Sequence, residues 1–335
     1  MKLSLILSVY NTSLFLRDCI ESLLHQSNFI LGDDYEIICV NDGSTDNSAE
    51  ILQQIGSEYK ISGGGYITVN QNNSGVSAAR NNGLRYAKGD YVWFIDSDDY
   101  IQQNCCAPLI EKLYNEDLDF LKVEFNSVQE EYPIGDHEEI PTLCEKSQWD
   151  TPTTAAKIII KREYLLNNHI EFAEDISYGE DTLWSFKIGL FKHRHKLLTN
   201  QFYNYRQHSG SVMHKMNSGK HLNSMWLMAM EYKMLLNSYD DEKFIIPRDT
   251  IQERLNWSIQ NILFDALKLG KSYRKEYLKR VKTEGLYPYP ILWNRLTLRH
   301  GLKNLIINMI SFFFPNSVYY KTVGHFHDFV KRFSH

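Results

Sequence analysis

The first 125 residues alternate short apolar runs with segments whose apolar residues recur every three or four positions. Short apolar runs are typical of buried strands, and the longer period is typical of amphipathic helices. Strands are expected at 3–9, 36–40, 66–69, 91–95 and 120–125, with helices at 14–26, 47–55, 76–88 and 104–115. Strands and helices in alternation form a mostly parallel sheet with helices on both faces, a Rossmann-like α/β fold.

The strand signals become sparse further along the chain. A polar stretch at 129–151 is expected to be a loop or short irregular strands, followed by a helix at 182–191 and a strand at 197–205. After about residue 215 only helical patterns remain, at 220–236 and 249–269. We therefore expect an α/β domain at 1–215 and an α-helical C-terminal region at 216–335.

Composition narrows the class of protein. The chain has 335 residues with 43% hydrophobic residues and a formal net charge of -5. These values are ordinary for a globular protein, exclude a disordered chain and give no support to nucleic-acid binding. The five cysteines form no C-x-x-C pair, which favours a reducing, cytoplasmic compartment.

The charge is unevenly spread along the chain. Residues 268–335 carry 13 Lys and Arg against 3 Asp and Glu, and residues 287–335 include 11 aromatic side chains. Basic residues with interleaved aromatic residues indicate a peripheral surface that lies on anionic lipid at the inner face of the cytoplasmic membrane. The alternative is a tail whose aromatic side chains pack on the rest of the protein. No apolar run reaches the ~18 residues of a membrane-spanning helix.

The strongest chemical signal is the apolar run 91–95, which leads directly into Asp96-Ser97-Asp98-Asp99. Residues i and i+2 of an extended chain face the same way, so Asp96 and Asp98 can share one target. Clustered carboxylates are electrostatically costly unless a cation is close, and oxygen ligands suit Mg²⁺ or Mn²⁺. Ligands bind at the carboxyl ends of strands in such sheets. The alternative is a strand-end turn with acidic caps.

Two further loops follow neighbouring strands. The loop 41–46 contains Asp42, which can accept hydrogen bonds from a base or a ribose, although its Ser-Thr-Asp sequence also suits a helix N-cap. The segment 73–81 combines Gly75 and small residues with Arg80. Arg80 can reach a phosphate or pair with the acidic cluster.

These segments, with Ser8-Val9-Tyr10-Asn11, occur in the order and spacing of glycosyltransferase family 2, which residues 1–215 resemble. The resemblance implies a GT-A fold, a nucleotide-sugar donor that is usually UDP-linked, a divalent metal (Mn²⁺ or Mg²⁺) and inversion at the anomeric carbon. Ser8 departs from the family, where many relatives have Pro. The contacts that the resemblance implies are base and ribose contacts at Ser8, Tyr10 and Asp42, nucleotide neighbours at Asn73 and Arg80, a ribose and metal contact at Asp96, and a direct metal ligand at Asp98.

Inverting transfer also needs a base that takes the proton of the acceptor hydroxyl, which a placed carboxylate can assist by ~10²–10⁴-fold. Glu180 and Asp181 follow Gly179 and open a helix, where acidic residues are also favoured for purely structural reasons. Similar enzymes carry Glu-Asp at this position. The resemblance therefore assigns the base to Asp181, with Glu180 orienting sugar or acceptor hydroxyls.

The segment 205–211 follows the last expected strand and supplies groups for a departing diphosphate. It resembles the loop that closes on the diphosphate in relatives. Arg206 and Ser211 would hold phosphate oxygens. His208 would donate to phosphate or complete the metal shell. The alternative interpretation is that His208 is an ordinary surface histidine.

Several other functions are disfavoured. The first strand lacks the G-x-G-x-x-G turn of a dehydrogenase and the glycine-rich basic loop of a pyrophosphorylase. A glycoside hydrolase would not need the loop at Asp42. We expect transfer of a hexose or N-acetylhexosamine to a hydroxyl of a growing surface glycan, with a glycan or lipid-linked glycan as acceptor. The alternative is a catalytically silent nucleotide-sugar-binding or scaffold protein of a glycan assembly complex.

Overall fold

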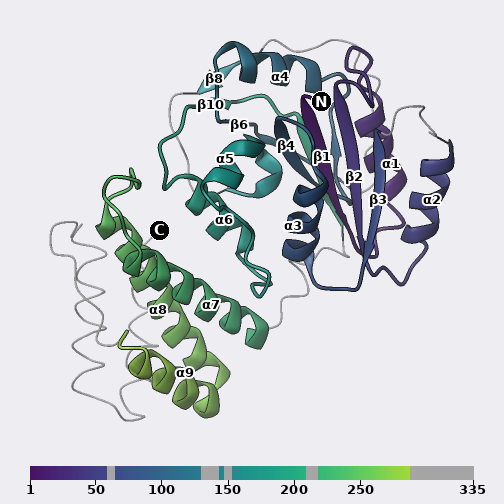
Figure 1. Cartoon of the computed structure of the whole chain (residues 1–335). Coiled ribbons are helices and arrows are strands. Elements are labelled where there is room, and N and C mark those ends of the chain that lie inside the picture. The colour runs from purple at the N-terminus through teal and green to yellow at the C-terminus, as the bar shows by residue number, and fades with distance from the viewer. Residues whose placement is uncertain (59–64, 130–142, 147–152, 209–217, 287–335) are drawn as a thin grey trace. The chain divides into compact units, whose positions relative to one another are not determined.

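The computed structural model describes residues 1–58, 65–129, 143–146, 153–208 and 218–286 (Figure 1). The chain divides into two compact units, one of residues 1–216 with 242–245 and the other of residues 217–241 with 246–335. The part of the second unit beyond residue 286 lies outside the described residues, and it holds the 11 aromatic residues and 6 of the 13 Lys and Arg residues of the expected membrane surface.

The first unit is built on an eight-stranded sheet in the order β3-β2-β1-β4-β9-β6-β10-β8. Its strands are β1 (Leu3–Val9), β2 (Tyr35–Asp42), β3 (Tyr66–Gln71), β4 (Tyr91–Asp96), β6 (Phe120–Lys122), β8 (Glu145–Lys146), β9 (Ile158–Lys161) and β10 (His195–Leu198). The pairs β1–β2, β1–β4, β2–β3 and β6–β10 are parallel, and the pairs β4–β9, β6–β9 and β8–β10 are antiparallel. The expected mostly parallel sheet is confirmed.

Helices cover both faces because side chains of a strand alternate between them. One core contains Leu3, Leu5 and Leu7 together with buried residues of three helices, α1 (Leu16–Leu24), α2 (Ser48–Glu58) and α4 (Cys106–Asn115). The other contains Ile6 with residues of α3 (Val76–Tyr86), α5 (Arg162–Asn167) and α6 (Glu180–Ile188). The strand β1 is therefore buried on both sides.

The helix α3 lies unusually close to the sheet. A Cβ atom added at Gly83 would stand 2.3 Å from Cγ2 of Ile6. Ser77, Ala78 and Ala79 are also small and buried on this helix. The close approach brings the first turns of α3 beside the ends of β1 and β4.

A second sheet has the order β5-β11-β7, with β5 at Tyr100–Ile101, β7 at Phe125–Gln129 and β11 at Tyr203–Gln207. Two sequence expectations were wrong at this point. The expected strand 120–125 is divided between β6 and β7, and the expected strand 197–205 is divided between β10 and β11. In both cases the chain leaves the large sheet and enters the small one.

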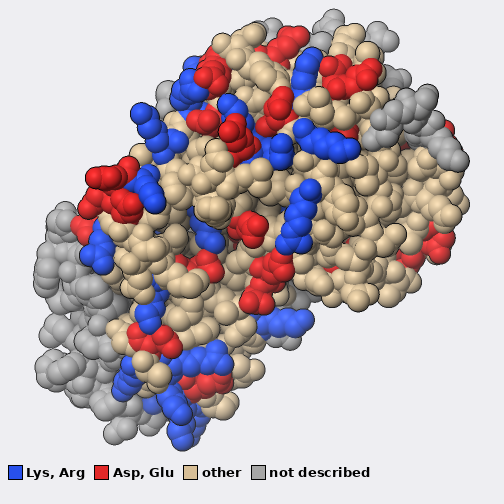
Figure 2. All heavy atoms as spheres, viewed as in Figure 1, with Lys and Arg blue, Asp and Glu red and all other residues tan. Residues whose placement is uncertain are grey.

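The second unit is helical in its described part, with α7 (Ser218–Asn237), α8 (Arg248–Leu269) and α9 (Lys271–Thr283). The helix α9 was not expected, because its surface is highly charged and Tyr277 and Val281 are its only buried residues. Among the described residues, none of the helices combines the length and the apolarity needed to cross a bilayer. On the face in Figure 2, acidic and basic side chains are interspersed over the described residues.

Candidate functional site

The candidate residues gather where β1, β2 and β4 end. Ser8 is opposite Asp96 across the β1–β4 pair, and Val9 is opposite Asn41 across the β1–β2 pair. Ser8 is half-buried and Tyr10 is 47% exposed. The strand order changes direction around β1, and the crevice beside such a point is where open parallel sheets bind ligands.

The loop after β2 is joined to the loop before α3 by a carboxylate. Asp42 is buried and accepts hydrogen bonds from the backbone nitrogens of Ser74 (2.7 Å) and Gly75 (2.8 Å). Gly43 has a φ of +68°, and a Cβ atom there would lie 2.8 Å from the backbone nitrogen of Asn73. Asp42 therefore supports the loop that presents the exposed Asn73.

The chain makes a tight turn at the end of β4, from Asp96 to Asp99, in which the nitrogen of Asp99 donates to the carbonyl oxygen of Asp96 at 3.0 Å. Asp99 is buried and accepts from the hydroxyl of Tyr203 and the backbone nitrogen of Arg206, each at 2.8 Å. The Tyr203 hydroxyl also accepts from the nitrogen of Asp96 at 3.0 Å. Burial, with Asp96 and Asp98 close by, raises the pKa of Asp99 to about 9. Asp99 and Tyr203 thus fix the turn that carries Asp96 and Asp98.

Asp98 points toward the end of β11. Its Oδ2 lies 3.0 Å from Nε2 of His208, whose ring packs against Phe15 with the centroids 4.5 Å apart. Burial and the neighbouring Asp96 raise the pKa of Asp98, and His208 opposes this effect. The Asp98 carboxylate suits Mn²⁺ or Mg²⁺, provided that diphosphate oxygens and water supply most of the other ligands, and the His208 imidazole suits Mn²⁺ better than Mg²⁺. Within the described ranges, no three His, Cys, Asp or Glu side chains form a ready metal cluster.

Arg80 joins the end of β4 to the start of α6. Its Nη2 donates to Oδ1 of Asp96 at 2.8 Å, and its Nη1 donates to Oδ1 of Asp181 at 2.6 Å. Nη1 also lies 3.5 Å from Oε1 of Glu180. Gly179 precedes this helix with a φ of +82°, so Glu180 and Asp181 occupy the first turn.

The two acids of α6 differ from ordinary carboxylates. Burial and the neighbouring Asp181 raise the pKa of Glu180 to about 7, although Arg80 acts against this. Burial also raises the pKa of Asp181, with Arg80 again opposing. A general base works best when its pKa is near the operating pH, and the upward shifts of both pKa values are in the direction that favours taking up a proton.

Arg206 lies deeper than the expected phosphate contact would require. Its side chain is 4% exposed, and Nη1 donates to Oδ2 of Asp18 at 3.2 Å. The guanidinium carbon lies 5.0 Å from the ring centre of Phe15 and 5.2 Å from that of Tyr100. These contacts give Arg206 a bracing role between α1, β5 and β11.

The structure thus brings most of the expected residues to one edge of the sheet. Ser211 lies outside the described residues. The sequence did not point to Tyr203 or to Asp18, because neither stands in a recognisable motif. Asp99 was visible as part of the acidic run, but nothing local distinguished its buried supporting role from that of a ligand.

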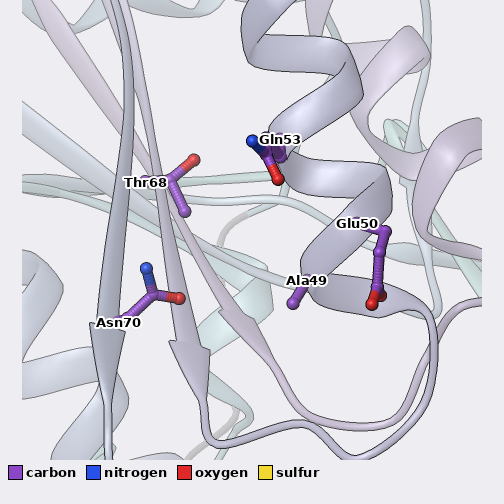
Figure 3. A pocket seen from close by; sticks show the side chains of 5 residues that line it. All are labelled: Ala49, Glu50, Gln53, Thr68 and Asn70. Atoms are coloured by element: carbon purple, nitrogen blue, oxygen red, sulfur yellow. The ribbon is translucent and has the colours of Figure 1, made fainter.

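A separate pocket lies between α2 and β3 (Figure 3). Ala49, Glu50 and Gln53 line it from the helix, and Thr68 and Asn70 line it from the strand. None of the candidate residues lines this pocket.

Comparison with known proteins agrees with this arrangement. The family model described as glycosyl transferase family 2 matches residues 4–167. These residues include the ends of β1, β2 and β4, where the candidate residues gather. Residues 4–167 are thus similar to glycosyl transferase family 2.

The individual relatives are distant. The chain is similar to the uncharacterized glycosyltransferase EpsJ of Bacillus subtilis, with 30% identity over 221 residues that cover 62% of each protein. It is also similar to the uncharacterized glycosyltransferase YibD of Escherichia coli, with 27% identity over 317 residues that cover 85% of this chain and 86% of that protein. The match with EpsJ thus spans less than two thirds of the relative's length.

Solved structures support the fold. The crystal structure of Staphylococcus aureus TarS 1-349 in complex with UDP-GlcNAc matches with a TM-score of 0.64 and 21% identity, covering 87% of this chain and 82% of that one. TarS is described as a poly(ribitol-phosphate) beta-N-acetylglucosaminyltransferase and is 26% identical over 207 residues. The expected GT-A fold is confirmed.

Proposed function

We propose that this protein is an inverting glycosyltransferase that moves a hexose or N-acetylhexosamine from a nucleotide sugar to a hydroxyl of a growing surface glycan. The match of residues 4–167 to the family model and the names of the relatives support glycosyl transfer. The neighbour with bound UDP-GlcNAc supports a UDP-linked donor. A relative that acts on poly(ribitol-phosphate) supports a cell-surface glycan acceptor.

One observation carries the proposal most directly. Asp98, beside His208, and Asp181, beside Glu180, lie at the same edge of the sheet, and Asp96 and Arg80 stand between them. A transferase needs two separate groups of side chains, because charge must be stabilised on the departing diphosphate and a proton must be removed from the acceptor. One pair of groups suits each task.

In the proposed reaction, the acceptor hydroxyl attacks the anomeric carbon on the side opposite the diphosphate. Asp181 takes the hydroxyl proton as the new C–O bond forms and the bond to the diphosphate breaks. Glu180 orients a sugar or acceptor hydroxyl. Tyr10, Asn73 and Ser8 border the space for the nucleotide.

Asp98 and His208, with Asp96 nearby, would hold Mn²⁺ or Mg²⁺, which would neutralise charge on the leaving diphosphate. The protein contributes these metal-binding side chains and holds them rigidly in place. Asp99 and Tyr203 keep the Asp98 turn in place through three hydrogen bonds.

The first test is thermal stabilisation of the full chain by UDP-, GDP- and dTDP-sugars with and without Mn²⁺. A ligand at 100 times its Kd should stabilise the protein by about 2.7 kcal/mol. Asp98→Ala should remove the Mn²⁺-dependent part, and the exposed Asp175→Asn serves as the matched acidic control. Equal stabilisation of Asp98→Ala and the original protein would remove Asp98 from the metal site.

The second test separates transfer from binding. Asp181→Asn should keep donor binding and lose transfer to a glycan acceptor by about 10²–10⁴-fold. Near-native turnover would reject Asp181 as the base. If Glu180→Gln alone abolished transfer with binding intact, the base would be Glu180. Donor binding with neither hydrolysis nor transfer across a panel of acceptors would favour the silent scaffold protein.

A further inference from the structure

The position of Arg80 differs from that of a nucleotide contact. Its side chain is 4% exposed and lies beneath the candidate site. Its two terminal nitrogens bind carboxylates that are 16 and 101 residues away in the sequence. One of these, Asp96, ends β4 on the donor side, and the other, Asp181, is the proposed base.

The guanidinium group makes this connection stiff. Its nitrogens are held in one plane at fixed angles, so the two carboxylates are set at a fixed separation. A lysine ammonium has the same charge but a single nitrogen on a flexible stem. It can hold one carboxylate closely but cannot reproduce the fork.

A second set of contacts ties the same two elements together. Phe94, two residues before Asp96, meets Trp184 edge-on with the ring centroids 5.6 Å apart. Phe172 stacks on Trp184 at 4.7 Å with an angle of 7° between the rings. The guanidinium carbon of Arg80 lies 5.1 Å from the centre of the Phe172 ring. Trp184 is one turn beyond Asp181 on α6, so the aromatic stack packs against the ion pair of Arg80 and Asp181 and supports it.

We infer that Arg80 is a positioning residue that fixes the base carboxylate of Asp181 relative to the donor-side carboxylate of Asp96. This inference rests on the proposed function and replaces the expected nucleotide contact of Arg80. Its consequence is that the distance from base to anomeric carbon is determined by a side chain that touches neither substrate. A 1 Å displacement of a reacting group can cost ~10²-fold in rate.

The test compares Arg80→Lys with Arg85→Lys, an exposed arginine on the same helix. Arg80→Lys should lower kcat for transfer by ~10²-fold and leave the Kd for UDP with Mn²⁺ within about threefold. Arg85→Lys should change neither. If Arg80 contacted the nucleotide, Arg80→Lys would instead weaken UDP binding at least tenfold with kcat retained, and that result would overturn the inference. Unchanged kcat and unchanged Kd for UDP would also overturn it.

A double-mutant cycle distinguishes positioning from general support of the fold. If Arg80 acts through Asp181, then Arg80→Lys should have no further effect on the residual kcat of Asp181→Asn. If the two substitutions instead lowered kcat independently, so that their effects multiplied in the double variant, the positioning role would be refuted. If Arg80→Lys does not fold, Phe172→Leu perturbs the stack without removing a charge and should also lower kcat without affecting the Kd for UDP. Full activity of Asp181→Asn would reject the proposed base, whereas an active Arg80→Lys beside an inactive Asp181→Asn would reject only this inference.

Discussion

The close approach of α3 to the sheet predicts that Gly83→Ala destabilises the first unit. The added methyl group would lie 2.3 Å from Cγ2 of Ile6 and 3.3 Å from Cγ2 of Val40. Ile6 and Val40 are both fully buried, so neither side chain can move into open space. Relief requires α3 to shift outward, which would also displace Arg80.

The magnitude follows from two opposing effects. Overpacking in a buried core costs about 1–3 kcal/mol, and a contact this short belongs at the upper end. Replacing a helical glycine by alanine contributes about 1 kcal/mol in the other direction. We expect the free energy of unfolding of the first unit to fall by about 1–2 kcal/mol.

The assay is hydrogen exchange of the backbone amides of β1 and α3 in increasing urea, which reports on the first unit alone. Gly56→Ala is the control, because its new Cβ would lie 3.3 Å from the ring edge of Tyr66, which can give way. That variant should be unchanged or up to about 1 kcal/mol more stable. Ile6→Ala removes the obstructing Cγ2, so Gly83→Ala should cost less in that background. Equal cost in both backgrounds, or no cost at all, would refute the argument.

Three other outcomes are expected. Tyr203→Phe removes the hydroxyl that binds Asp99 and the nitrogen of Asp96, and should lower the free energy of unfolding by about 1–3 kcal/mol and weaken Mn²⁺-dependent UDP binding, both measurable by thermal denaturation. The pKa of Glu145 is lowered to about 2 by hydrogen bonds from two neighbouring lysines. Its stabilising contribution is therefore present above the unfolded-state pKa and is lost as the pH falls from about 4.5 through 2. At pH 7, Glu145→Gln should lower the free energy of unfolding by less than about 1 kcal/mol, because the pair is exposed, and this loss should shrink toward zero as the pH falls to 2 and below. Deletion of the residues after Leu286 should reduce co-sedimentation with anionic vesicles, and equal sedimentation of both forms would favour the packing role of that segment.

The order of strands and helices in the first half could be predicted because each element carries its own period. The run Leu3–Val9 is apolar except for Ser4 and Ser8, as expected for a strand buried on both faces. The division of 197–205 into β10 and β11 could not be predicted in this way. It depends on distant hydrogen bonds, such as those from the nitrogen of Thr199 to the carbonyl of Cys144 and from the nitrogen of Gln102 to the carbonyl of Phe202.

The types of residue in the candidate site could be predicted from the sequence, but the contacts between those residues could not. The acidic run after β4 and the acidic pair after Gly179 were recognisable by their position behind a strand and before a helix. The connection from Asp96 through Arg80 to Asp181 spans 101 residues of sequence, and no local pattern encodes it. The same is true of Tyr203, which reads locally as one more aromatic residue in a strand.

The hydrogen bonds described for Asp96, Asp98 and Asp181 all end within residues 1–208. The framework of the reaction centre therefore has its supports in the N-terminal unit. Substitutions in the helices α7, α8 and α9 leave those supports in place. Exchange of these three helices would therefore leave the described contacts of Asp96, Asp98 and Asp181 unchanged.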